Sequence, residues 1–114
     1  EEEELVATTV VTKIEVLRGR FDSILKAADG KQLEIAQQRL VESEQVLENF
    51  LIISVDAASA SQFDKLRKRK KLKKIGRADL LIASISLAHE ATLVTRNLRH
   101  FKQVTDLKLE NWAD

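Results

Sequence analysis

The run from Ala78 to Ala88 constrains the fold of this chain more than any other stretch, because it is apolar nearly all the way round a helix. A helix with one apolar stripe rests on a single layer, whereas a helix that is apolar on every side is buried between layers. The segment Thr92–Thr95 follows it closely and is rich in β-branched residues, which favour extended structure. A buried helix that leads into a buried strand is typical of an α/β domain.

The rest of the chain repeats this alternation of strands and helices. Hydrophobic periodicity and capping residues predict a strand at Leu5–Thr8, a helix over Val10–Ala28 capped by Thr9, a helix over Gln32–Phe50, a strand at Leu51–Val55, a helix that follows Asp56 and is broken by Gly76, and a last strand within Leu107–Trp112. Asp29-Gly30 is interpreted as the stop of the first helix. The order predicts a largely parallel sheet flanked by helices.

The composition indicates a single soluble domain. The chain has 114 residues, a charged fraction of 32% and a formal net charge of +1, which fit one folded domain rather than a disordered chain. It has no cysteine, which excludes a disulfide framework and a thiolate metal site and allows a cytoplasmic location. No apolar run approaches the roughly 20 residues of a membrane span, and Glu1–Glu4 do not open a signal peptide.

Acidic and polar residues lie where strands end and helices begin. Glu15 falls in the second turn of the first helix, Asp79 opens the buried helix, and Thr95-Arg96-Asn97 lies at the exit of the late strand. Loops at the carboxyl ends of parallel strands converge, so we expect these residues to share a crevice. Two carboxylates brought together there are stabilised by a hard cation such as Mg²⁺ or Mn²⁺, which also suits phosphodiester hydrolysis. The alternative is that Asp79 compensates the helix dipole and Glu15 is merely solvated.

Three stretches resemble successive signatures of PIN-domain nucleases, specifically the VapC-type toxins of bacterial toxin–antitoxin pairs. They are TTVVTKIEVLRG (Thr8–Gly19), IGRADLLIASISLAHEATLVTRNLRHF (Ile75–Phe101) and LKLENW (Leu107–Trp112), in the expected order over nearly the whole chain. The resemblance implies a PIN-like α/β fold, with a central parallel sheet flanked by helices in three layers. It also implies a metal-dependent endoribonuclease that cleaves RNA phosphodiester bonds, with an antitoxin protein as partner.

Position by position, the resemblance implies that Glu15 and Asp79 are catalytic residues that hold Mg²⁺ or Mn²⁺, with Thr95 and Asn97 completing the catalytic set. His100 stands where relatives often have an aspartate. The family opens with a strand that ends in an aspartate, which nothing before Leu5 supplies. We therefore expect residues 1–114 to form a single PIN-like domain that lacks this strand, and we expect a cytoplasmic homodimer with no membrane association.

Basic residues provide candidate contacts with RNA. Lys65–Lys74 contains eight Lys and Arg, and such a field attracts phosphate regardless of sequence, although a solvated helix face is an equal reading. Arg77, Arg96 and Arg99 flank the expected site and are predicted to bind RNA phosphates, although each could instead pair with a surface acid. His89 is interpreted as a structural residue at the end of the buried helix.

Two other functions fit the same sequence. A non-catalytic nucleic-acid-binding module would use Lys65–Lys74 for affinity, and its binding would weaken steeply with salt without requiring a divalent ion. A purely structural interaction domain would show neither property. In every case the amphipathic helices between Val10 and Phe50 offer a surface for an antitoxin peptide or a second subunit.

Overall fold

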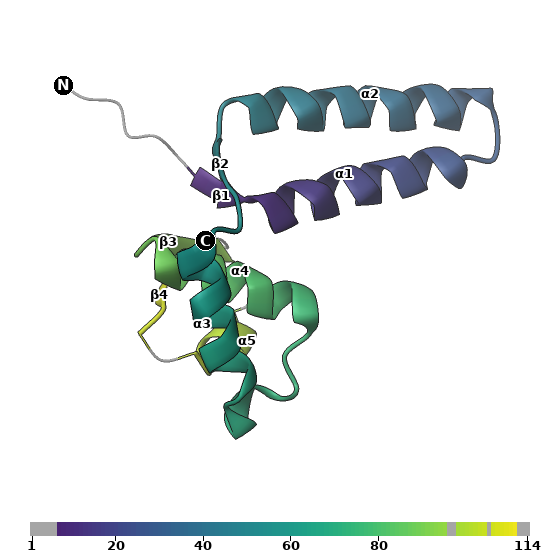
Figure 1. Ribbon diagram of the computed structural model, residues 1–114. Coiled ribbons are helices and arrows are strands. Elements are labelled where there is room, and N and C mark those ends of the chain that lie inside the picture. Colours follow the sequence, from purple (N-terminus) through teal and green to yellow (C-terminus); the bar gives the residue numbers. More distant parts are fainter. Residues whose placement is uncertain (1–6, 96–97, 105, 112–114) are drawn as a thin grey trace. The chain divides into compact units, whose positions relative to one another are not determined.

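A computed structural model describes residues 7–95, 98–104 and 106–111 of the chain. The chain divides into two compact units, Glu1–Ile53 and Ser54–Asp114 (Figure 1). Strands alternate with helices in both units, and the strand pairs are parallel. The predicted α/β class with parallel pairing is confirmed.

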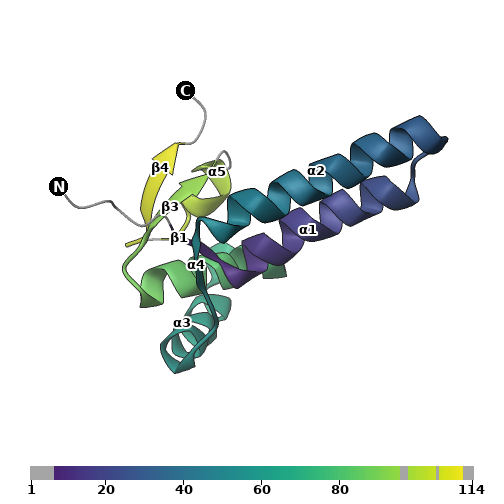
Figure 2. The same cartoon turned by 90° about the horizontal axis from the view of Figure 1, so that it is seen from above.

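The N-terminal unit is a strand pair joined through a helical hairpin. Its elements are β1 (Ala7–Thr9), α1 (Val10–Leu25), α2 (Gly30–Glu48) and β2 (Leu51–Ile53). Strands β1 and β2 pair in parallel, with Ala7 opposite Leu51 and Thr9 opposite Ile53. Helices α1 and α2 run side by side in both views of the molecule (Figure 2). The Arg20 Nε donates a hydrogen bond of 2.9 Å to the Ser43 Oγ and ties the two helices together.

Side-chain caps define where these helices begin. The Thr9 Oγ1 accepts a hydrogen bond of 3.1 Å from the Thr12 backbone N–H, which confirms the predicted cap of α1. The interpretation of Asp29-Gly30 as the end of that helix is wrong. Helix α1 ends at Leu25, and Asp29 instead caps α2 by accepting a bond of 2.8 Å from the Gln32 N–H. An aspartate oxygen satisfies free N–H groups, which are found only at the start of a helix.

The C-terminal unit packs two helices on each other and adds a second strand pair. Its elements are α3 (Ala57–Arg67), a short 3₁₀ helix η1 (Lys70–Leu72), α4 (Arg77–Ala88), β3 (Thr92–Thr95), α5 (Leu98–Phe101) and β4 (Lys108–Asn111). Strands β3 and β4 pair in parallel, with Thr92 opposite Lys108 and Thr95 opposite Asn111. The buried apolar core of this unit consists of Leu66, Leu72, Ile75, Leu80, Ile82, Ala83, Ile85, Phe101 and Val104.

Helix α4 is buried as its composition predicts. Leu80 and the five residues from Ile82 to Ser86 are shielded from solvent, and Ala83 and Ile85 have no exposed area. Two of them are serines, and the Ser84 Oγ donates a hydrogen bond of 2.7 Å to the Leu80 carbonyl oxygen within the same helix. Because of this bond, the buried hydroxyl keeps a hydrogen-bond partner inside the apolar core.

The prediction that Gly76 breaks the preceding helix is wrong. Helix α3 already ends at Arg67, and Gly76 is the N-cap residue of α4. Like charges three and four positions apart destabilise a helix, and the dense run of Lys and Arg after Leu66 has many such pairs. Among the residues that the structure describes, no helix is long and apolar enough to cross a membrane.

Candidate functional site

Asp79 lies in the first turn of α4, the most buried helix of the C-terminal unit. Its side chain is half-buried, and its neighbour Leu80 belongs to the core. Free N–H groups at a helix start carry partial positive charge, which favours a carboxylate at this position. Asp79 therefore lies at the edge of the core, where the residue is partly exposed to solvent.

The other predicted residues of the C-terminal unit come from β3 and the segment after it. Thr95 is half-buried and ends β3, opposite Asn111 of β4. Arg96 and Asn97 lie outside the described residues, as does the side chain of His100. Asp79 and Thr95 thus belong to one compact unit.

Glu15 belongs to the N-terminal unit. It lies on α1 and is exposed to solvent, as are its neighbours Ile14 and Val16. Glu15 and Asp79 are therefore supplied by different units, and a joint site of these two acids stays a prediction.

A divalent ion such as Mg²⁺ needs oxygen ligands that converge on one point. Among the described residues, no group of three or more His, Asp and Glu is arranged to hold a metal. Mg²⁺ is usually held by only one or two carboxylates and keeps several waters, with substrate phosphates as further ligands. The half-buried carboxylate of Asp79 is of the chemical type that such an ion requires, whereas a closed cage of protein ligands is not found in the described part of the chain.

Two of the three predicted phosphate-binding arginines can be placed. Arg77 is the first residue of α4, and its guanidinium carbon lies 5.2 Å from the centroid of the Phe63 ring on α3. This distance is within the range of a cation–π interaction, which orients the guanidinium two positions before Asp79. Arg99 lies exposed on α5.

An ion pair that sequence reasoning missed joins the start of α3 to the end of α4. The His89 Nε2 lies 3.0 Å from the Asp56 Oδ2, while the Asp56 Oδ1 accepts bonds of 2.8 Å from both the backbone N–H and the hydroxyl of Ser59. These bonds from Ser59, followed by the charge of His89, hold the pKa of Asp56 below its usual value. The structural role predicted for His89 at the end of the buried helix is confirmed.

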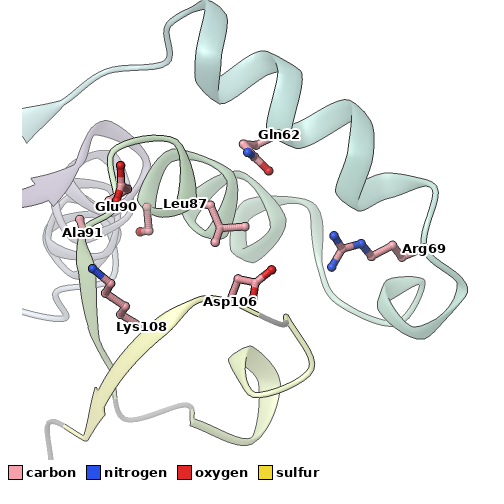
Figure 3. Close-up of a pocket in the computed structure, with 8 residues that line it drawn as sticks. Gln62, Arg69, Leu87, Glu90, Ala91, Asp106 and Lys108 are labelled. Carbon is pink, nitrogen blue, oxygen red and sulfur yellow. The ribbon is translucent and has the colours of Figure 1, made fainter.

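A pocket of about 300 Å³ lies within the C-terminal unit (Figure 3). It is lined by Gln62, Arg69, Ser86, Leu87, Glu90, Ala91, Asp106 and Lys108. The pocket lies at the last turn of α4, while Asp79 lies in the first turn. At 1.5 Å per residue the separation of Asp79 and Ser86 along the helix axis is roughly 10 Å. The pocket is therefore a feature separate from the Asp79 region.

The sequence from residue 1 to residue 107 matches the family model of the PIN domain. The chain belongs to the PIN-domain family. This PIN domain is 34% identical over 109 residues to Ribonuclease VapC2 of Rickettsia felis, an alignment that covers 94% of this chain and 74% of the relative.

Solved structures agree with the family assignment. The crystal structure of VapBC2 from Rickettsia felis, bound to a promoter DNA fragment, superimposes with a TM-score of 0.75 at 34% identity, covering 95% of this chain and 75% of that one. FitAcB from Neisseria gonorrhoeae gives a TM-score of 0.70 at 25% identity, covering 93% and 74%. VapBC-1 from nontypeable Haemophilus influenzae gives 0.77 at 23% identity, covering 100% and 79%, and supports the fold alone.

Proposed function

We propose that this PIN domain is the ribonuclease toxin of a toxin–antitoxin pair and cleaves RNA phosphodiester bonds with the help of Mg²⁺ or Mn²⁺ in the cytoplasm. The observation that carries the proposal is the 34% identity to a ribonuclease of the VapC type over 94% of the chain. The half-buried Asp79 at the opening of the core helix supports it, because the divalent ion of a metal-assisted hydrolysis is held by carboxylate oxygens.

The proposed roles follow from the chemistry of each side chain. Asp79 and Glu15 would each supply a carboxylate oxygen to the ion. A bound Mg²⁺ or Mn²⁺ activates water and offsets charge on the leaving oxygen. Thr95 would orient a water molecule through its hydroxyl, and Asn97 through its amide.

The arginines would bind the substrate. We propose that Arg77, whose guanidinium lies against the Phe63 ring, donates two parallel hydrogen bonds to a phosphate, and that Arg96 and Arg99 have the same role. Such contacts position the RNA backbone relative to the acids without reading its sequence.

Cleavage of a labelled RNA in Mn²⁺ tests the catalytic assignment. We expect Glu15→Gln and Asp79→Asn each to lower kcat/KM by about 100-fold or more, because metal stabilisation of the transition state is worth several kcal/mol and each 1.36 kcal/mol is tenfold in rate. The matched controls are Glu34→Gln and Asp22→Asn, which change exposed acids on α2 and α1. Undiminished cleavage by both site variants would overturn the assignment, as would full activity in the presence of a chelator.

For partners, we propose that an antitoxin peptide or a second copy of the chain docks on the α1–α2 hairpin. Large apolar side chains on this hairpin are exposed, including Phe21 at 53% and Leu25 at 67%. Exposed apolar groups of this size on two adjacent helices suit an amphipathic segment of a partner. Sedimentation of the free chain over a range of concentrations, followed by titration with its antitoxin, distinguishes the two occupants, and Phe21→Glu should weaken whichever association occurs.

A further inference from the structure

The segment Lys65–Lys74, here called the basic segment, is not used by the proposed site. It contains eight of the chain's 19 Lys and Arg and none of its 18 Asp and Glu, so the remaining residues carry a net negative charge. All eight cationic side chains are exposed. A concentration of like charge costs stability through repulsion and attracts polyanions. Such a concentration in an otherwise acidic chain requires a functional reason.

The basic segment has a fixed backbone. Leu66, Leu72 and Ile75 are buried, with exposed fractions of 0%, 3% and 8%. Backbone hydrogen bonds recur every three residues, from Arg69 N to Leu66 O, from Leu72 N to Arg69 O and from Ile75 N to Leu72 O. The segment is therefore a series of tight turns anchored in the core of the C-terminal unit.

Exposure, rather than one helical spacing, sorts the side chains of the segment. The 3₁₀ helix η1 covers only Lys70–Leu72, and Arg69 before it has an extended backbone with a ψ of 127°. Leu66, Leu72 and Ile75 are buried in the core, while the exposed Arg69 lines the pocket of Figure 3. The seven other cationic residues are exposed to solvent: Lys65, Arg67, Lys68, Lys70, Lys71, Lys73 and Lys74. The outward side of the segment is thus almost purely cationic.

The character of this surface favours RNA over other polyanionic partners. A membrane-binding helix needs exposed apolar residues to enter the lipid, and the two leucines of the basic segment are buried. The segment has no aromatic residue on which bases stack, so its contacts are with phosphates and independent of sequence. Closely spaced cations match the dense charge of a nucleic-acid backbone.

The basic segment also lies next to the proposed catalytic acid. Five peptide units separate Lys74 from Asp79, and this length of chain spans at most about 18 Å. We propose that the basic segment is a second RNA-binding surface, which holds the phosphate backbone of the substrate outside the cleavage site and delivers the adjoining stretch to Asp79. This inference rests on the proposed function for its substrate, and its test is separable from that of catalysis.

The test compares two triple variants of equal charge change. Lys68→Gln/Lys71→Gln/Lys74→Gln removes three exposed cations from the basic segment, while the control Lys26→Gln/Lys31→Gln/Arg39→Gln removes three exposed cations from the N-terminal unit. Lys26 and Lys68 are both helix C-cap residues, which matches the local effects of the substitutions. Binding to a fluorescent single-stranded RNA is measured in chelator, so that cleavage does not interfere, over about 50 to 200 mM salt.

We expect the test variant to bind RNA about tenfold or more weakly, and its plot of log affinity against log salt to be shallower by about 2, because each lost contact with single-stranded RNA removes roughly 0.7. The control should retain its affinity. In cleavage assays the test variant should show a higher KM for a long RNA and an unchanged kcat. Its cleavage of a dinucleotide, whose single phosphodiester would occupy the cleavage site and leave no further phosphate for the basic segment, should match that of the wild type.

Equal loss of affinity in both triple variants would overturn the proposal, and so would unchanged RNA binding by the test variant. A test variant that loses affinity for vesicles of anionic lipid but not for RNA would also overturn it. Asp79→Asn separates this result from the proposed function. RNA that binds through the basic segment but is never cleaved by the wild-type chain would refute the nuclease and leave the second surface intact. Cleavage that depends on Asp79 but not on the basic segment would refute the second RNA-binding surface and leave the proposed nuclease intact.

Discussion

The backbone of Glu90, at the end of α4, is strained. Glu90 follows the C-cap residue His89 and has a φ of 51°, in the left-handed region that favours glycine. Its N–H donates to the Leu87 carbonyl, and the Ala91 N–H donates to the Ser86 carbonyl. This is the Schellman pattern of helix termination, in which glycine is the usual residue at the Glu90 position.

We predict that Glu90→Gly stabilises the protein. Relief of the left-handed conformation is worth about 1–2 kcal/mol and exceeds the added flexibility of glycine in the unfolded chain, which costs about 0.5–1 kcal/mol. Thermal unfolding should show a higher Tm than the wild type. The control is Glu34→Gly in the middle of α2, where glycine should lower stability by about 1 kcal/mol. A decrease for Glu90→Gly similar to that of the control would contradict the interpretation.

Asp56 predicts a pH dependence of stability. Because its pKa is lower in the folded chain than in the unfolded chain, it stabilises the fold above its unfolded pKa of about 3.9 and loses this contribution as the pH falls through the folded pKa. Asp56→Asn keeps the helix cap but cannot ionise.

The wild type should therefore unfold at a higher temperature than Asp56→Asn at pH 6, and the difference should shrink as the pH is lowered below about 3.9. Asp56→Ala also removes the cap and should be less stable than either at every pH. A difference between wild type and Asp56→Asn that is constant with pH would show that the carboxylate charge is not involved.

At the scale of elements, the two helical pairs differ in how much they bury. In the C-terminal unit α4 is almost entirely enclosed, whereas α1 has no buried residue and α2 has only Ala36. Burial of apolar area is the main source of stability, so α4 should be the most stable element and the hairpin among the least.

We predict that Ile85→Ala lowers the free energy of unfolding by about 2–5 kcal/mol, since Ile85 has no exposed area and its truncation leaves a cavity. Phe21→Ala on α1 removes a larger side chain that is 53% exposed, and it should change stability by less than about 1 kcal/mol. Denaturant unfolding of both variants checks this order. A larger loss for Phe21→Ala would mean that the hairpin is more important to the fold of the free chain than its exposure indicates.

The elements also show which kinds of sequence signal are reliable. Caps at Thr9 and Asp56 and the burial of α4 could be predicted because they depend on residues close together in sequence. The end of α3 at Arg67 could not be predicted in this way. Gly76 suggested a later end of the helix, whereas repulsion between Lys and Arg side chains ends it earlier. The contact between Asp56 and His89 depends on the packing of α3 against α4, which periodicity does not specify.

For the whole molecule, the proposed metal makes a prediction that does not depend on RNA cleavage. Asp79 and Glu15 are far apart in the chain and belong to different units, so an ion that both ligate would stabilise the folded state as a whole. The family and the α/β class could be predicted from motifs that lie within one unit or the other. The joint placement of the two acids depends on tertiary arrangement, which neither motif contains.

We predict that Mn²⁺ at about 100 times its Kd stabilises the wild type by about 2.7 kcal/mol, measured as a rise in Tm. Glu15→Gln and Asp79→Asn should each reduce the rise. If both acids ligate one ion, as proposed, the double variant should lose little more than the stronger single variant. Calorimetric titration with Mn²⁺ supplies an independent measure of the Kd. A rise in Tm that is undiminished in the double variant would place the ion elsewhere.

The crowding of cations between α3 and α4 also has a practical consequence for anyone who purifies this protein. Its overall charge is close to zero at neutral pH, and an average of that kind predicts little retention on an ion-exchange column. An ion-exchange resin, however, contacts the local charge of a protein surface and not the net charge of the protein. The protein should therefore adsorb to heparin and to sulfonate beads as a strongly basic protein does. Bacterial nucleic acid should copurify with it until high salt displaces the contaminant.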